Sequence, residues 1–205
     1  MTSPHYDNIE KPNPRNQDAW FSFTCSFCDR KVTELVGAVF KDITGGRQPR
    51  IVNEVNLIVC PNCKHGSVYN SKFGISPGSQ FGPDIQGLPA DIKNAYNEAR
   101  NCMQVKAFTA AELICRKVIM HVAVEKEAGE GESFAHYLEY LKKEGFMAPA
   151  MEKWVDLIRQ HGNKSTHELD SPDKDRAEST IMFTAGLLRL IYEMDHMAQK
   201  YAPDT

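Results

Sequence analysis

Two kinds of hydrophobic periodicity divide the chain near residue 88. Up to about residue 75, the apolar residues come in short runs rich in Val, Ile, Phe and Tyr, with turn residues between them. Runs of this length and composition predict β-strands. They are WFSF before Cys25, KVTELVGAVF after Cys28, EVNLIVC up to Cys60 and GSVYNSKF after Cys63. DITGGRQPR (42–50) predicts a hairpin or loop tip, and the Gly- and Pro-rich segment 74–89 predicts a linker or covering loop.

After Pro89 the apolar period becomes helical, with hydrophobic residues recurring three and four positions apart. The segment 107–127 is apolar almost all round, and such a helix belongs at the centre of a bundle. The pattern predicts five helices, at about 89–104, 106–128, 133–144, 148–161 and 172–200.

Residues that commonly start or stop helices lie at the predicted boundaries. Ser133 predicts an N-cap, and Gly162 predicts a helix end with a left-handed residue. Ser171 followed by Pro172 predicts the start of the last helix, with Ser171 as its N-cap.

Four of the six cysteines form two CxxC pairs, and 31 residues separate Cys28 from Cys60. A CxxC turn places two thiolates on one side of a tight loop, and two such turns complete a tetrahedral four-cysteine site. The sequence therefore predicts one structural Zn²⁺ per chain, held by Cys25, Cys28, Cys60 and Cys63. The alternative, unrelated thiols or a redox pair, lacks the βαβ pattern in which a redox CxxC is expected. The remaining two cysteines are predicted to pack on helices.

Together these patterns predict an α+β protein. Residues 1–88 form a small β-rich zinc ribbon with an N-terminal extension and a linker loop, and residues 89–205 form a five-helix bundle. Because four cysteines close the metal site, the zinc is structural and leaves no position open for water.

Charge and composition narrow the functional classes. The net charge is −3, and it divides into +1 for residues 1–88 (9 Lys/Arg, 8 Asp/Glu) and −4 for residues 89–205 (15 and 19). Neither part has the basic excess of a general nucleic-acid binder. No window has the roughly 18 apolar residues of a membrane helix, and the N-terminus lacks the apolar core of a signal peptide. We expect a cytoplasmic protein that has no contact with membranes and no small-molecule cofactor.

Two polar clusters interrupt the helical half. Glu112 and Arg116 lie one turn apart in the central helix, where a charge needs a partner. The stretch LIRQHGNKSTHEL (157–169) allows two interpretations. It is a helix end, with Gly162 in the turn and a capping box from Ser165 to Glu168, or it is a functional cluster of Arg159, His161, Asn163 and His167.

The order RxxGNxxxH after a helix carrying AAELICRKVI resembles the bacterial family called domain of unknown function 4145, within the HEPN-like helical domains. The resemblance covers about residues 88–195. It implies a helical bundle that often dimerises, in a defence or nucleic-acid-processing system. Many relatives are RNases with an arginine, four to six residues, then a histidine. That motif places the histidine at His167 and the asparagine at Asn163. The arginine departs from the motif, because seven residues and not four to six separate Arg159 from His167.

Three functional hypotheses follow. The first is a binding or regulatory module rather than an enzyme, which dimerises through the helical half and binds a protein partner or RNA. The second is a metal-independent endoribonuclease using Arg159 and His167, with Asn163 in support. The third is a ribbon that binds nucleic acid through Lys41, Arg47 and Arg50 on its loop. The binding-module hypothesis predicts a structural polar network of Glu112, Arg116 and Gly162. It also predicts that His167 lies beside Arg116 or Glu112. Its dimer surface is predicted at apolar residues of the last helix: Met182, Phe183, Leu187 and Leu190.

Overall fold

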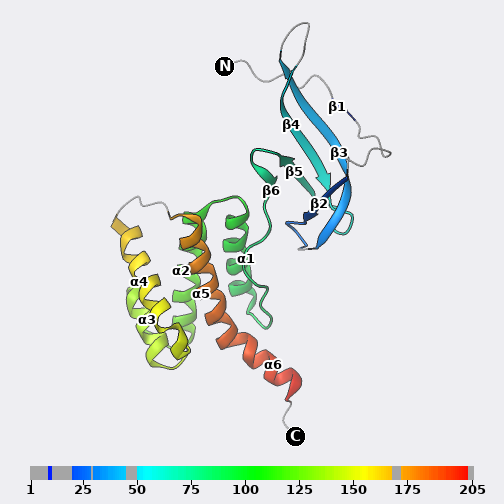
Figure 1. The fold of residues 1–205 in the computed structure, drawn as a ribbon. Helices are drawn as coiled ribbons and strands as arrows, with labels where there is room; N and C mark the ends of the chain where they lie inside the picture. The colour runs from blue at the N-terminus through cyan, green and yellow to red at the C-terminus, as the bar shows by residue number, and fades with distance from the viewer. Residues whose placement is uncertain (1–8, 11–19, 29, 45–49, 168–171, 203–205) are drawn as a thin grey trace. The chain divides into compact units, whose positions relative to one another are not determined.

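A computed structural model describes residues 9–10, 20–28, 30–44, 50–167 and 172–202 (Figure 1). Within these ranges, the side chains of residues 9–10, 20–21, 34–44, 50–54 and 161–167 lie outside the description. The chain forms two compact units, Met1–Gln80 and Phe81–Thr205. The first contains strands and the second contains helices, so the predicted α+β class is confirmed.

The first unit is built from antiparallel strands. Their order is β1-β3-β4-β5-β6, and β2 also pairs with β3. The four predicted strand runs are confirmed, with β3 and β4 extending into the predicted loop tip at 42–50. Residues 74–76 of the predicted linker form an edge strand. The bounds are β1 Ile9–Glu10, β2 Trp20–Thr24, β3 Lys31–Thr44, β4 Arg50–Val59, β5 Gly66–Asn70 and β6 Gly74–Ser76.

Strand register brings the two CxxC turns to the same place. The β2–β3 ladder closes at Thr24↔Lys31, and the β4–β5 ladder closes at Val59↔Gly66. Each CxxC turn therefore joins two paired strands across the same number of residues. Because β3 also pairs with β4, the two hairpins share one sheet and their turns lie close together.

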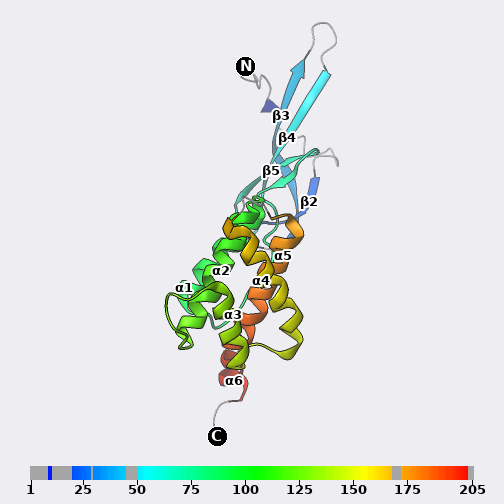
Figure 2. The ribbon, with the colours of Figure 1, turned by 90° about the vertical axis from the view of Figure 1, so that its left-hand side faces the viewer.

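The second unit is a bundle around α2, which packs against α1, α3 and α5 (Figure 2). This central place confirms the prediction made from its nearly all-round apolar sequence. The last predicted helix is one helical run in which a π-helical turn, Arg189–Glu193, joins α5 to α6. The bounds are α1 Ala90–Gln104, α2 Phe108–Glu125, α3 Phe134–Lys143, α4 Glu152–His167, α5 Lys174–Leu188 and α6 Met194–Tyr201.

Two predicted helix boundaries are wrong. Helix α4 does not end at Gly162 but continues to His167, so Ser165 lies inside a helix and not at a helix start. Glycine costs only about 1 kcal/mol in a helix interior, and no proline follows it before position 172 to stop the helix. The cap of α5 is Asp173, whose carboxylate accepts a hydrogen bond from the N–H of Arg176, rather than Ser171. The Ser133 cap of α3 is confirmed.

The segment 81–88 covers one face of the helical unit. Arg100, buried in α1, donates from Nε to the Phe81 carbonyl (3.1 Å) and from Nη2 to the Gly82 carbonyl (2.8 Å). Ile85 inserts into the helical core, and the Tyr96 hydroxyl donates to the Pro83 carbonyl. These contacts satisfy a buried guanidinium with backbone oxygens, so the polar side chain fixes the covering segment in place.

None of the helices in the described part of the chain combines the length and the apolar composition that crossing a membrane requires.

Candidate metal centre

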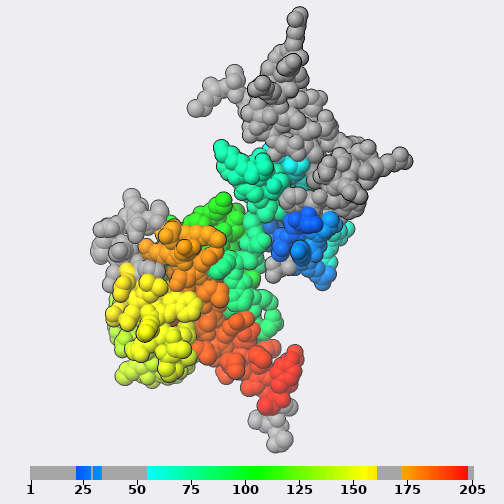
Figure 3. Space-filling model, in the orientation of Figure 1, coloured from blue at the N-terminus to red at the C-terminus, as the bar shows by residue number. Residues whose placement is uncertain are grey.

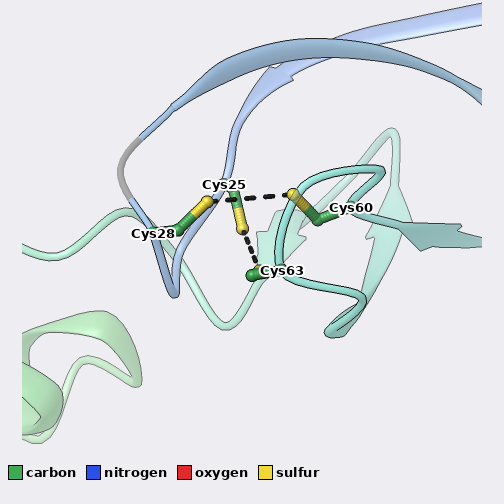
Figure 4. A group of neighbouring side chains, drawn as sticks. All are labelled: Cys25, Cys28, Cys60 and Cys63. Atoms are coloured by element: carbon green, nitrogen blue, oxygen red, sulfur yellow. Dashed lines mark hydrogen bonds between the residues drawn. The ribbon is translucent and has the colours of Figure 1, made fainter.

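The side chains of Cys25, Cys28, Cys60 and Cys63 converge on one point (Figure 4). The first two come from the turn between β2 and β3, and the other two from the turn between β4 and β5. All four Sγ atoms lie within 4.8 Å of one another, and all four thiols are free. The structure thus brings together the four cysteines that the sequence predicts as metal ligands.

The spacing of the sulfur atoms fits a tetrahedral metal ion. With Zn–S bonds of about 2.3 Å, the edges of a sulfur tetrahedron are about 3.8 Å long. The Cys25–Cys63 and Cys28–Cys60 sulfur pairs are 3.6 Å and 3.8 Å apart. The donor set is four soft thiolates, which favour Zn²⁺ and iron–sulfur chemistry and disfavour Mg²⁺ or Ca²⁺. The residues present therefore fit a single thiophilic ion.

The two turns have the same backbone construction. The Cys25 N–H donates to the Arg30 carbonyl, and the Cys60 N–H donates to the His65 carbonyl, both at 2.9 Å. Each bond closes a loop over the same span of chain. The Asn62 side-chain amide and the Phe27 N–H also donate to sulfur, at 3.5 Å to Cys28 Sγ and Cys25 Sγ respectively. Donors of this kind stabilise thiolates and orient them.

The surroundings shift the pKa values of these thiols in opposite directions. The N–H of Arg30, with help from the Asn62 amide, lowers the pKa of Cys28 to about 6. The N–H of Cys63 lowers the pKa of Cys60. Burial raises the pKa of Cys25 to about 12. The thiolate is the form that binds a metal, so the turns favour metal binding at Cys28 and Cys60. The buried Cys25 thiol would lose its proton when a cation binds.

The protein core around this cluster is small. Among the described residues of the first unit, its buried hydrophobic members are Phe23, Cys25, Ile58 and Cys60. Two of these four are ligand candidates, so among the described residues the metal ligands themselves make up half of this small core. A structural Zn²⁺ contributes on the order of 10 kcal/mol to the folding of small domains. A metal ion held by the four cysteines would therefore add substantially to the stability of this unit.

Glu112 in the helical unit has a partner that the sequence did not predict. Glu112, only 3 % exposed, accepts a hydrogen bond at 2.8 Å from Nη2 of Arg176 at the start of α5. Arg116 places its guanidinium over the Phe134 ring, 4.7 Å from the centroid. Burial lowers the pKa of Arg116, and the nearby Glu112 carboxylate opposes that shift.

Sequence reasoning missed Arg176 because its partner lies 64 residues away. A signal was present: Arg176 precedes Ala177 and stands one turn before Thr180, both of them core positions of α5. A charge in that register needs a buried partner. Asn62 was missed as well, because nothing in a CxxC spacing shows which neighbour will donate to sulfur.

Of the predicted catalytic residues, Arg159 is described and exposed on α4, where Nη2 lies 3.2 Å from the Asp156 carboxylate. The side chains of Asn163 and His167 lie outside the described residues, as do the side chains of Lys41, Arg47 and Arg50. The backbone of Asn163 and His167 is described as part of α4, and positions 159, 163 and 167 follow i, i+4, i+8. They therefore share one side of the helix.

The residues predicted for a dimer surface divide into two groups. Phe183 and Leu187 are buried in the core of the chain's own bundle, so neither is available to a partner. That part of the prediction is wrong, because α5 is covered on more than one side. Met182 and Leu190 are exposed, and the apolar surface continues along α6 through Met194, Met197 and Tyr201.

Comparison with known proteins identifies the helical unit. The model of the family described as "Domain of unknown function (DUF4145)" matches residues 97–203, more than half of the 205 residues. No curated protein and no solved structure matches the chain. The matched range begins within α1 and ends after α6. The chain therefore belongs to the DUF4145 family, and its four-cysteine cluster lies in the unit that precedes the matched region.

Proposed function

We propose that this protein is a non-catalytic binding module, in which a structural Zn²⁺ holds a ribbon-like β unit that precedes a helical bundle of the HEPN-like type. The observation that carries the proposal is the closed cluster of four cysteine sulfurs within 4.8 Å of one another. Four thiolates saturate a tetrahedral ion, so no position remains for water or substrate. Chemistry at the metal is thereby disfavoured, and a scaffold role is favoured.

The charges of the helical unit support a binding role over catalysis. The buried Glu112 carboxylate is paired with Arg176, and Arg159 is paired with Asp156. The carboxylate beside Arg159 lowers the net positive charge that this part of α4 offers to a phosphate. Family membership, together with the HEPN-like resemblance of the sequence, is consistent with a place in a bacterial defence or nucleic-acid-processing system.

A homodimer is part of the proposal. Leu190, Met194, Met197 and Tyr201 are exposed and recur at spacings of four, three and four residues. This is the spacing with which one helix packs against another. No residue of α6 is buried, and Figure 3 shows its surface, coloured red, at one end of the helical unit. A second copy would cover these side chains.

The second candidate function is a metal-independent endoribonuclease. It is favoured by one observation, namely that the continuous α4 helix places positions 159, 163 and 167 on one side. An arginine and a histidine on one face could stabilise phosphate charge and transfer a proton.

Incubation of the full chain with end-labelled single-stranded RNA in excess chelator separates the two functions. The binding-module account expects intact RNA after prolonged incubation. Cleavage that disappears in His167→Ala and persists in Asp156→Ala would establish the nuclease instead. Asp156→Ala is the matched control because it frees Arg159 without removing it.

A further inference from the structure

Two aromatic side chains form an exposed stack on the CxxC turns. The rings of Phe27 and His65 lie 4.4 Å apart between centroids and 21° from coplanar. Phe27 comes from the first turn and His65 directly follows the second. Phe27 is 46 % exposed and does not belong to the small core of the unit. Since each ring uses one face for the stack, much of the Phe27 ring remains accessible to a ligand.

Cationic residues come from the same part of the chain as this pair. Arg30 and Lys64 are exposed on the same two turns, and Lys31 follows Arg30. Arg30 is oriented by donating from Nη1 to the Asn62 side-chain oxygen at 2.9 Å, across the two turns. From Val55 to Gln80 the chain has two lysines and no acidic residue. This half of the ribbon is therefore locally basic, although the protein as a whole carries a net charge of −3.

The backbone at Lys64 adds a second observation. Lys64 has φ of 63°, a left-handed conformation that glycine adopts without penalty and a side chain adopts at a cost. A lysine therefore stands next to His65 in sequence at a position whose backbone conformation favours glycine. Outliers of this kind are frequently found at binding sites.

The charge of the metal centre itself has to be overcome. Four thiolates and one Zn²⁺ carry a net charge of −2, which repels phosphate. Arg30, Lys31 and Lys64 together supply three positive charges on the turns and the residue that follows. Asp29, between Cys28 and Arg30 in the sequence, removes one of these charges, so the side chains supply a net +2 that offsets the −2 of the centre. Phosphate contact at the stack therefore depends on Arg30 and Lys64 individually and not on a positive field.

We propose that Phe27 and His65 form a stacking platform for single-stranded nucleic acid, with Arg30 and Lys64 holding the flanking phosphates. Flat aromatic faces beside cations match the two features of an unpaired strand, exposed base faces and a charged backbone. A duplex hides its base faces, and an acidic peptide has no faces to stack. Its residues differ from Lys41, Arg47 and Arg50, which the sequence offers as a nucleic-acid-binding loop. The platform proposal rests on the proposed function, because the metal holds the two turns together.

Fluorescence anisotropy with a labelled 12-nucleotide single strand tests the platform, with RNA and DNA of one sequence as separate arms. Binding to either strand is expected, weaker for the duplex of the same sequence. Phe27→Leu keeps an apolar side chain but removes the aromatic face, and it should weaken binding about fivefold or more. Phe27→Tyr should retain binding. Phe73→Leu is the matched control, since Phe73 is exposed beside Lys72 on the turn at the other end of β5.

Lys64→Gln gives an independent measurement that leaves the stack intact. Loss of one phosphate contact should lower the dependence of log affinity on log salt concentration by about 0.7 for a single strand. Zinc content is measured for every variant. A wild-type protein without zinc contradicts the proposed function.

If the wild-type protein contains zinc, any of three results would contradict the stacking platform without contradicting the proposed function. The first is that it binds no single strand. The second is that it binds a labelled glutamate hexapeptide or the duplex equally well. The third is that it loses no affinity in Phe27→Leu and Lys64→Gln.

Discussion

The buried ion pair between Glu112 and Arg176 should contribute to stability in a way that a surface pair does not. Arg176→Met removes the partner at 2.8 Å from a carboxylate that is 3 % exposed. The other oxygen, Oε2, has no hydrogen-bond partner among the described residues. The variant therefore leaves a charged group in the protein interior, which is the costly kind of substitution.

The magnitude follows from the distance and the burial. At an effective dielectric constant of about 20, Coulomb attraction at this separation is about 6 kcal/mol, and desolvation offsets much of it. Removing one member of a buried pair typically costs about 3–5 kcal/mol. With a urea dependence of about 2 kcal/mol/M, the unfolding midpoint of the helical unit should fall by about 1.5–2.5 M.

Circular dichroism at 222 nm during urea unfolding follows this unit, because the described helices all lie within it. Arg176 makes further contacts, so the pair itself is measured by a double-mutant cycle with Glu112→Leu. The double variant should recover most of the stability lost in Arg176→Met, since no charge is then left unpaired. The matched control is Lys142→Met, which breaks an exposed pair of nearly equal length, 2.7 Å to Glu152. Equal destabilisation by Arg176→Met and Lys142→Met would refute the reasoning.

Three further predictions concern α4 and the surface. Gly162→Ala should stabilise the protein by roughly 0.5–1 kcal/mol, because the residue lies inside a helix; a lower melting temperature would show that the helix ends there. Lys142 lowers the pKa of Glu152, so Glu152→Gln should be less stable than wild type at neutral pH. That difference should vanish as the pH falls through the lowered pKa of the folded carboxyl, and thermal melts across pH would check it. Met194→Glu with Met197→Glu should convert a homodimer into a monomer of 23.1 kDa by light scattering; a wild-type mass of one chain would contradict the dimer.

Local patterns predicted much of the fold. The four strand runs and the central place of α2 follow from side-chain alternation and from an apolar surface that a bundle must bury. The cysteine cluster follows from CxxC spacing, because a tight turn leaves the two thiols few other directions. Each strand run, each CxxC turn and the apolar surface of α2 is decided mainly by the residues of that element itself.

The failures concern weak local preferences and distant partners. Gly162 and Ser171 are common helix-boundary residues, but each preference is worth only about 1 kcal/mol, and neighbouring residues outweigh it. Arg116 was the expected partner of Glu112 because it lies one turn away. The observed partner, Arg176, comes from α5, and only tertiary packing brings it there. Likewise, Phe183 and Leu187 look available in sequence and are buried by the fold.

The central claim is that the four cysteines hold one structural zinc ion. The most direct measurement is the zinc-to-protein ratio of the full chain, purified without chelator and analysed by plasma mass spectrometry. One zinc per chain is predicted, and it should be lost in Cys28→Ser combined with Cys63→Ser. It should be unchanged in Cys102→Ser, because Cys102 lies in α1 and outside the cluster. A wild-type chain that folds with no bound metal, and whose four thiols react freely, would contradict the account.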